Sequence, residues 1–244
     1  DIDLTHKWND NLKEYLNNAF INKPDLKLIT LQATRCCQGE NIIDGMFQLD
    51  GKVYNSEDML NNSIENTKWL RDTVGNGTSI GLENNNYYPT PAYDIVADGD
   101  FITHVLKKNN LFLLLDIAHA MVTAHNKKIR YDQYIATLPL DKLIQLHICQ
   151  PVLPKGGIAR DTHNEPNDEM YLEVIRLIKK YPTIKYLTIE YYKDKDILIR
   201  SINKLRQLIG SKLVDGKIKQ LFKPSFLSFY SYHSYDYISL INLY

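Results

Sequence analysis

The chain has 244 residues, of which 44% are hydrophobic and 24% charged, a composition that is typical of globular domains and excludes wholesale disorder. A chain of this length buries about 70% of its unfolded surface, so its core needs no disulfide or metal for stability. Lys plus Arg and Asp plus Glu number 29 each, and the resulting zero net charge argues against a dedicated nucleic-acid-binding protein.

The sequence shows no sign of export or of membrane insertion. No apolar run approaches the roughly 20 residues that a membrane helix requires. The chain begins at Asp1 with no signal-peptide pattern, which leaves open a segment upstream. Cys36 and Cys37 are adjacent and Cys149 stands alone, an arrangement that is no disulfide framework. We therefore expect a cytoplasmic location and no membrane partner.

Five runs rich in apolar residues predict buried strands. Most are too uniformly apolar for a strand with one face in water, so they are typical of parallel strands covered on both sides. They are Leu26–Ala33, Thr78–Asn84, Leu111–Asp116, Leu143–Cys149 and Ile184–Glu190. A shorter run at Ile2–Thr5 is a candidate sixth strand.

Amphipathic segments separate these strands and predict helices. One helix starts near Trp8, and a shorter one follows Asp100. A third is predicted to begin at Pro166, since proline is favoured at the first helical position. Asp194 is predicted to cap a fourth helix that stops at Gly210.

Strands that alternate with helices predict an α/β fold with right-handed crossovers. A doubly wound sheet and a (β/α)8 TIM barrel both fit this pattern. No glycine-rich phosphate-binding motif follows any strand, so the commonest reason to choose the doubly wound sheet is missing. Because a closed barrel needs eight strands, we expect a barrel that lacks its first strand in this chain.

The last residues differ from the rest. From Ser225 to Tyr244 the only charged residue is Asp236, among five Ser and five Tyr. We expect a barrel domain over residues 1–210 and a C-terminal extension of unassigned role over residues 211–244. The extension either packs over the barrel or forms a poorly ordered tail; a tail that binds a membrane or a partner is an alternative, although its aromatic spacing gives no amphipathic helix.

Residues that bind metals recur where the predicted strands end. Glu83, Asp116, His147 and Glu190 lie at or near the carboxyl ends of four successive strands. In a parallel barrel those ends share one rim, which is where active sites lie. A carboxylate that ends a buried strand is unfavourable unless something compensates its charge, and four such residues in register favour a metal site over four separate structural roles.

Two short motifs add three more candidate ligands. A turn after Asp116 can bring His119 to the same metal, and in an extended segment Asp161 and His163 point the same way. Seven candidates exceed what one tetrahedral ion needs, so we expect two or three ions bridged by carboxylates. Mixed His and carboxylate ligation suits iron, zinc or manganese, and the absence of thiolates from the set disfavours a structural zinc site.

Two neighbours of this set have open roles. Cys149 lies two residues from His147 and can approach the same metals, although a small buried hydrophobic residue is the simpler interpretation. Asn84 is predicted to orient Glu83 as a hydrogen-bond donor.

Four segments together resemble the MbnB/TglH/ChrH family of multinuclear non-haem iron proteins. They are residues 82–102 (LENNNYYPTPAYDIVADGDFI), 113–126 (LLLDIAHAMVTAHN), 134–151 (YIATLPLDKLIQLHICQP) and 160–166 (RDTHNEP). The resemblance extends from about Lys27 to Gln207 and implies a xylose isomerase-like TIM barrel that holds two or three iron ions. It also implies oxidative modification of cysteines in ribosomally made peptides, often with a small partner protein that presents the peptide.

The resemblance carries over to individual residues. It implies metal-ligand roles for Glu83, Asp116, His147, Asp161, His163 and Glu190. His119 differs from the Asn that many members have, and matches a D-x-x-H variant that is also found in the related endonuclease IV barrels. Gln32 stands near a position where the family has a histidine, and His6 lacks the family's context, so the number and identity of the metals stay open.

Three functions compete at this point. The first is an O2-dependent iron oxidase or oxygenase that modifies a cysteine-containing peptide. The second is an endonuclease IV-like or sugar isomerase-like metalloenzyme of the same superfamily. Zero net charge argues against a DNA enzyme, because contact with the phosphate backbone favours a basic face. The third is a barrel that serves as a non-catalytic scaffold.

Overall fold

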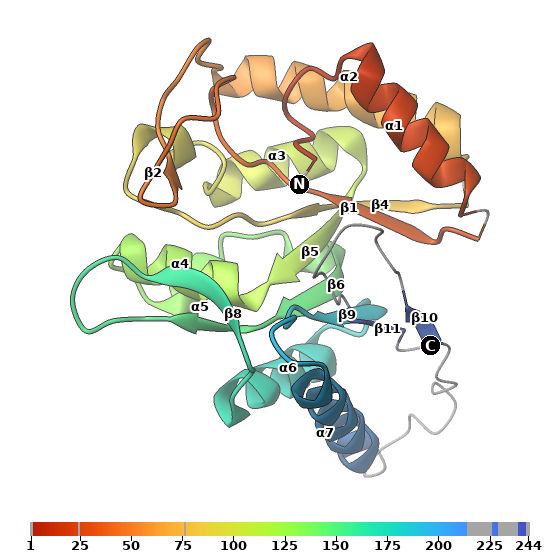
Figure 1. The fold of residues 1–244 in the computed structure, drawn as a ribbon, viewed down its shortest axis with the longest axis vertical. Helices are drawn as coiled ribbons and strands as arrows, with labels where there is room; N and C mark the ends of the chain where they lie inside the picture. Colours follow the sequence, from red (N-terminus) through yellow and green to blue (C-terminus); the bar gives the residue numbers. More distant parts are fainter. Residues whose placement is uncertain (1, 24, 76, 214–225, 229–238, 243–244) are drawn as a thin grey trace.

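The computed structural model describes residues 2–23, 25–75, 77–213, 226–228 and 239–242. Its centre is a curled parallel sheet, and all five predicted strands are confirmed to within three residues at either end (Figure 1). The sheet strands are β1 (Leu28–Leu31), β4 (Ser79–Glu83), β5 (Phe112–Asp116), β6 (Leu143–Ile148) and β9 (Tyr186–Ile189).

The strands follow one another around the sheet in chain order. Strand β1 pairs in parallel with β4, β4 with β5, β5 with β6, and β6 with β9. The predicted sixth strand is present as a single parallel bridge from Asp3 to Gln32, beside β1. Beyond β9 the sheet continues in the antiparallel sense through β11 (Ser239–Asn242) and β10 (Phe226–Ser228).

This arrangement confirms an α/β fold with part of a TIM barrel. Among the described residues the parallel part of the sheet has five strands and one bridge, fewer than the eight strands of a closed barrel. This agrees with the expectation of a barrel that lacks its first strand in this chain. The last sheet strands come from the C-terminal extension, but they pair with β9 and not with the open edge at Asp3. The division into residues 1–210 and 211–244 stays a prediction, since most of the second range lies outside the described residues.

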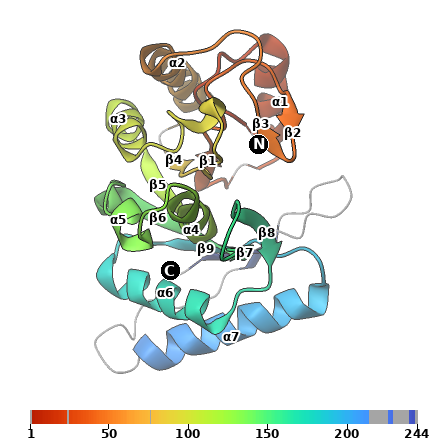
Figure 2. The same cartoon turned by 90° about the vertical axis from the view of Figure 1, so that its left-hand side faces the viewer.

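Helices lie on the outer side of the curled sheet, and Figure 2 shows α2, α3, α6 and α7 there. The helices are α1 (Asp10–Ile21), α2 (Ser56–Val74), α3 (Gly99–Asn109), α4 (Ile117–Asn126), α5 (Tyr131–Ile135), α6 (Asp168–Lys180) and α7 (Lys195–Leu213), with short 3-10 turns at Pro91–Tyr93 and Leu140–Lys142. No helix among the described residues is long and apolar enough to cross a membrane.

Two predicted helix ends need correction. Pro166 is not the first residue of α6, because the helix begins at Asp168 and the side chain of Asn167 accepts a hydrogen bond from the backbone N–H of Met170. Helix α7 starts after Asp194, as predicted, and the Asp194 carboxylate accepts from the N–H of Ile197. It does not stop at Gly210 but continues to Leu213.

Two small hairpins rise from the loops on the carboxyl side of the sheet. One joins β2 (Ile42–Ile43) to β3 (Met46–Phe47), and the other joins β7 (Gln150–Val152) to β8 (Arg160–Asn164). The guanidinium of Arg160 donates to the backbone carbonyl of Asp44 at 2.6 Å, which ties the two hairpins together.

The core explains why the central strands are apolar throughout. Leu82 on β4, Leu113 on β5 and Leu146 on β6 are completely buried. They lie on the face of the sheet opposite to the ligand-type residues of the same strands. Their burial stabilises each by about 1.5–3 kcal/mol relative to an exposed side chain. The polar residues at the ends of these same strands are therefore held in a rigid frame.

Candidate metal centre

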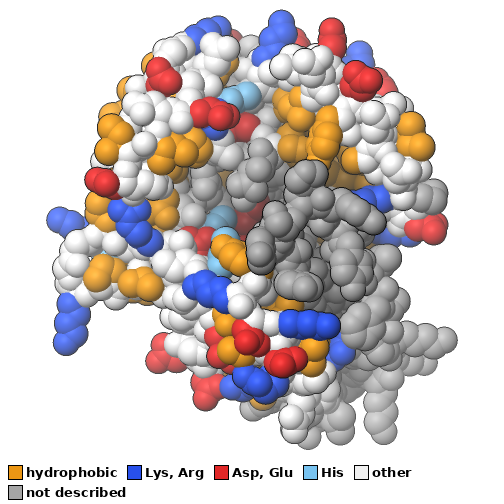
Figure 3. All heavy atoms as spheres, viewed as in Figure 1, with side chains coloured by type: hydrophobic (Ala, Val, Ile, Leu, Met, Phe, Trp, Pro, Cys, Tyr) orange, Lys and Arg blue, Asp and Glu red, His pale blue; other side chains and the backbone are white. Residues whose placement is uncertain are grey.

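All seven predicted ligands lie at the carboxyl-end edge of the sheet. Glu83 and Asp116 are the last residues of β4 and β5, His147 is next to last on β6, and Glu190 directly follows β9. Their partners come from α4, which provides His119, and from β8, which provides Asp161 and His163. Figure 3 shows histidine and acidic side chains inside a hollow of the molecular surface.

Four of the ligand-type residues form one group. Single ligand atoms of Glu83, Asp116, His147 and Glu190 all lie within 4.8 Å of one another. His147 Nδ1 is 3.3 Å from Glu83 Oε1 and 2.9 Å from Glu190 Oε1. Three parallel strands and the residue after a fourth therefore present their side chains to one point.

The remaining three form a second group around Asp161. Its Oδ2 lies 2.9 Å from His163 Nε2 and 3.3 Å from His119 Nε2. The groups touch, because His163 Nε2 is 3.5 Å from Glu190 Oε2 and His119 Nε2 is 3.9 Å from Asp116 Oδ2. His163 reaches this position with a φ of 45°, a left-handed conformation that is unfavourable for histidine and needs support from its surroundings.

The orientation of His119 is set by β4. Its Nδ1 lies 2.8 Å from the backbone carbonyl oxygen of Asn84, so the tautomer with a proton on Nδ1 donates there and leaves Nε2 as the coordinating atom. The Asp116 carboxylate also accepts from the backbone N–H of His119 at 2.7 Å, which caps α4. One aspartate thus positions the helix whose first turn carries the histidine.

Asn84 acts on Asp116 and not on the side chain of Glu83. Its side-chain amide donates to the carbonyl of Asp116 at 3.1 Å, and its side-chain oxygen accepts from the N–H of Asp116 at 2.8 Å. These two bonds join the end of β4 to the end of β5. Among the described residues it is Gln32 that donates to Glu83, from Nε2 to Oε2 at 2.7 Å.

Three positioning residues were missed by the sequence reasoning. Gln32 holds Glu83, Gln145 lies 3.0 Å from His147 Nε2 and donates to Thr188, and the hydroxyl of Tyr192 lies 2.9 Å from His163 Nδ1. A signal existed for Gln145, since alternate residues of a strand share a face and it lies two before His147. Nothing in the local sequence marks Tyr192.

The chemistry of this donor set fits bound cations. Glu83 Oε1 and Asp116 Oδ2 are buried and have no hydrogen-bond partner among the described residues. An unpaired buried oxygen costs about 1–3 kcal/mol, and a charged one more. Cations placed beside these atoms would satisfy both. The residues present therefore fit a centre of more than one ion.

The pKa values show the same need for positive charge. Burial, together with the neighbouring carboxylates Glu190, Glu83 and Asp161, raises the pKa of Asp116 to about 8. Burial opposes protonation of His119 and His147, but the nearby carboxylates prevail and raise both pKa values well above the ordinary one. Positive charge beside these carboxylates is therefore favoured, whether an imidazole or a bound cation carries it.

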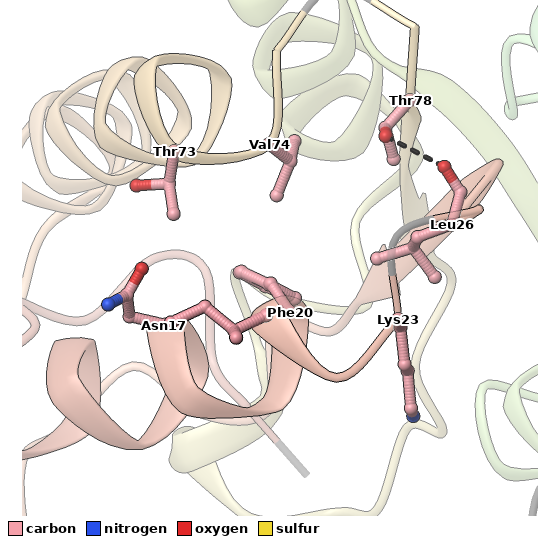
Figure 4. Close-up of a pocket in the computed structure, with 8 residues that line it drawn as sticks. Asn17, Phe20, Lys23, Leu26, Thr73, Val74 and Thr78 are labelled. Carbon is pink, nitrogen blue, oxygen red and sulfur yellow. Dashed lines mark hydrogen bonds between the residues drawn. The ribbon is translucent and has the colours of Figure 1, made fainter.

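Two further buried thiols and two pockets include none of the seven ligand-type residues. The Cys36 and Cys37 thiols are buried and face the backbone carbonyls of Pro91 and of Gln48, respectively. A pocket of about 360 Å³ lies on the same edge of the sheet, lined by the N-terminal segment and by Thr34 and Arg35 after β1. The pocket in Figure 4, about 190 Å³, lies at the opposite edge beside Leu26 and Thr78 and holds no metal-ligand residue.

Comparison with known proteins agrees with this geometry. The model of a family described as "RiPP precursor modification enzyme MbnB/TglH/ChrH" matches residues 53–206, a range that contains all seven ligand-type residues. RiPP denotes a ribosomally synthesised and post-translationally modified peptide. A UPF0276 protein of Caulobacter vibrioides is 32% identical over 85 residues, which cover 35% of this chain and 30% of that protein. A UPF0276 protein of Vibrio parahaemolyticus is 27% identical over 114 residues, covering 46% and 39%.

Solved structures show the same fold. A D-tagatose 3-epimerase-like protein superimposes with a TM-score of 0.53 at 16% identity, over 87% of this chain and 76% of the other. The 3-keto-D-glucoside 4-epimerase YcjR from E. coli gives a TM-score of 0.52 at 13% identity, over 85% and 76%. At these identities both likenesses concern the fold alone and not the reaction.

The matched segments span less than half the length of these two UPF0276 relatives. The family match is broader, since it extends over more than half of the chain and includes every strand end that carries a candidate ligand. On this evidence the chain belongs to the MbnB/TglH/ChrH family of RiPP precursor modification enzymes.

Proposed function

We propose that this protein is an iron-dependent oxidase or oxygenase that modifies a cysteine of a ribosomally made peptide. The observation that carries the proposal is the convergence of four carboxylates and three imidazoles in two adjoining groups at one edge of the sheet, where Glu83 and Asp116 each keep one oxygen without a hydrogen-bond partner among the described residues. Family membership supports the peptide as substrate class.

The chain offers two neighbouring places for ions. Glu83, Asp116, His147 and Glu190 would hold one ion, and Asp161 with His163 would hold a second. His119 Nε2 lies between them, within 4 Å of both Asp116 and Asp161. Iron bound in such a set supplies one-electron chemistry with O2, and mixed His and carboxylate ligation is suited to it.

The remaining residues shape the site for a peptide. Hydrogen bonds with Gln32 and Tyr192 orient the side chains of Glu83 and His163, and Asn84 fixes the backbone of Asp116, so that little rearrangement is needed when metal binds. The β2–β3 and β7–β8 hairpins border the carboxyl side of the sheet, and the adjoining pocket beside Arg35 gives room for a side chain. A small protein that presents the peptide is part of the proposal.

The test combines metal counting with turnover. The protein is purified without O2, loaded with Fe(II), and its metal content per chain is measured. A cysteine-containing peptide, such as a short precursor where one is encoded beside this gene, is then exposed to protein and O2, and its mass is recorded. We expect at least two ions per chain and an O2-dependent mass change.

Variants separate the two ion positions. Glu190→Gln keeps the shape but removes a charge, so it should lower metal content and turnover together. Asp161→Asn and His163→Ala should empty one position and leave the other filled. Glu169→Gln, on the exposed face of the first turn of α6, is the matched control.

Two results would contradict the proposal. Full metal content in Glu190→Gln, Asp161→Asn and His163→Ala would show that these residues are not ligands. A metal-loaded protein that is inert toward O2 and peptide, yet isomerises a sugar or cleaves abasic DNA, would replace the proposed reaction with that of the alternative.

A further inference from the structure

Cys149 lies beside the Asp161 group and is not used by the proposed ligand set. It is completely buried, and it directly follows β6, two residues after His147. Its thiol donates to Asp161 Oδ1, with the sulfur 3.2 Å from that oxygen. The sulfur therefore adjoins the carboxylate on the side that the histidines leave free.

Asp161 lies between this sulfur and two imidazoles. Its second oxygen, Oδ2, faces Nε2 of His119 and of His163, at 3.3 and 2.9 Å. Each histidine has its other ring nitrogen occupied, by the carbonyl of Asn84 or by the hydroxyl of Tyr192. Both Nε2 atoms are thus directed at the space that Asp161 borders, as in metal sites where a second partner fixes the ring.

The distances allow the sulfur to share an ion with these groups. Ligand atoms of Cys149, Asp161 and His163 all lie within 4.8 Å of one another. Bonds of about 2.3 Å to sulfur and 2.0–2.2 Å to nitrogen or oxygen bridge separations of up to about 4.4 Å, and Asp161 lies 3.2 Å from the sulfur and 2.9 Å from His163 Nε2. A second feature points to a cation where the two groups meet. Asp116 Oδ2 is completely buried, has no hydrogen-bond partner among the described residues, and lies 3.9 Å from His119 Nε2.

We infer that Cys149 is a thiolate ligand of the ion held by Asp161 and His163. The inference rests on the proposed metal centre and adds a soft donor to one of its two positions. On binding, the S–H bond is replaced by a metal–sulfur bond and one proton passes to solvent, with no change of oxidation state. A thiolate favours iron or zinc over manganese or magnesium, so the two positions differ in metal preference.

Cobalt(II) tests this ligand directly, because thiolate coordination adds a sulfur-to-cobalt charge-transfer band in the near ultraviolet. The full chain is titrated with cobalt(II) without O2, and the band is followed beside the visible bands of the bound metal. We expect the charge-transfer band in the wild type and its loss in Cys149→Ala and Cys149→Ser, while cobalt at the other position remains. Serine keeps a hydroxyl that can donate to Asp161, so it controls for packing.

The other cysteines provide the matched control. Cys36→Ala/Cys37→Ala leaves Cys149 as the only cysteine, and the band should persist there. X-ray absorption at the cobalt edge of this double variant should show a sulfur neighbour. That readout applies even if the Cys149 variants do not fold.

The outcomes distinguish this inference from the proposed function. Cobalt binding with no charge-transfer band and no sulfur neighbour, or a band that survives Cys149→Ala, overturns the role of Cys149 and leaves the metal centre standing. Failure of the wild type to bind cobalt or iron at all overturns both.

Discussion

Gln32 is a single neutral side chain that orients a charged residue of the candidate metal centre. It lies at the end of β1, where its amide donates to Glu83 Oε2, and so it leaves Glu83 Oε1 directed at His147. A neutral amide can orient a carboxylate without adding a charge of its own. The orientation of Glu83 at the end of β4 therefore depends on a residue 51 positions earlier in the chain.

Replacing this amide should weaken metal binding while keeping the fold. We expect Gln32→Leu, which is similar in size, to lower metal affinity about 10–100-fold, as is typical when a partner that orients a ligand is lost. Isothermal titration with Fe(II) or Zn(II) without O2 measures the change. Gln38→Leu, at an exposed position of the next loop, is the control. Equal affinities in both variants would mean that Gln32 does not orient Glu83.

Helix α2 was missed by the sequence analysis because much of its buried side is polar. Its buried residues Met59, Ser63, Asn66, Thr67 and Leu70 follow helical spacing, but three of the five are hydrophilic. Asn66 donates to the backbone carbonyls of Leu4 and His6, at 2.8 and 2.6 Å. The helix therefore anchors the N-terminal segment by hydrogen bonds. It lacks the continuous apolar stripe by which a helix is recognised from its sequence.

Removing that anchor should destabilise the protein. Asn66→Leu leaves two carbonyls without their donor, and each buried unsatisfied group costs about 1–3 kcal/mol. Urea unfolding should show a lower midpoint with an unchanged slope. Asn61→Leu, on the exposed side of the same helix, should change the free energy of unfolding little. Equal midpoints for the two variants would contradict the anchoring role.

Two helical glycines should respond oppositely to the same substitution. An added Cβ at Gly99, at the start of α3, would lie 2.8 Å from the backbone oxygen of Thr137, whereas one at Gly210 in α7 meets nothing within 4 Å. We expect Gly99→Ala to be destabilising by about 1–3 kcal/mol through overpacking. Gly210→Ala should be stabilising by about 0.5–1 kcal/mol, because alanine is a better helix former. Thermal unfolding measures both, and a shift of the same sign in both would refute this account.

At the scale of the whole molecule, the candidate metal centre joins segments that the sequence keeps far apart. Its seven residues come from β4, β5, α4, β6, β8 and the end of β9. The sheet is open at the edge beside Asp3, so barrel closure does not hold these ends together among the described residues. Cations bound between the strand ends would supply part of that restraint.

Metal removal should therefore lower global stability. A ligand at 100 times its dissociation constant stabilises the folded state by about 2.7 kcal/mol when the unfolded state does not bind it. We expect a chelator to lower the thermal midpoint and added Fe(II) or Zn(II) to restore it. In Glu190→Gln the shift should shrink, and His104→Gln, at an exposed position of α3, should show the full shift. A midpoint that is indifferent to metal in the wild type would contradict this role.

The sequence by itself determined the strands, the class of fold and the residues at the strand ends. Apolar runs such as 111–116 and 143–149 need burial on both faces, and only a parallel sheet covered by helices provides it. Because parallel strands have their carboxyl ends on one edge, the sequence alone predicts that Asp116 and His147 meet. These properties follow from local patterns and from one rule of topology.

Only the tertiary structure decided how those residues are held and grouped. Asn84 bonds to the backbone of Asp116, Tyr192 fixes His163, and the Cys149 sulfur reaches Asp161, all across neighbouring strands and loops. The antiparallel strands β11 and β10 also join the sheet next to β9. The apolar pattern of a strand specifies which face of that strand is buried, but not which residue of a distant loop or strand lies opposite it, and contacts of this kind depend on the latter.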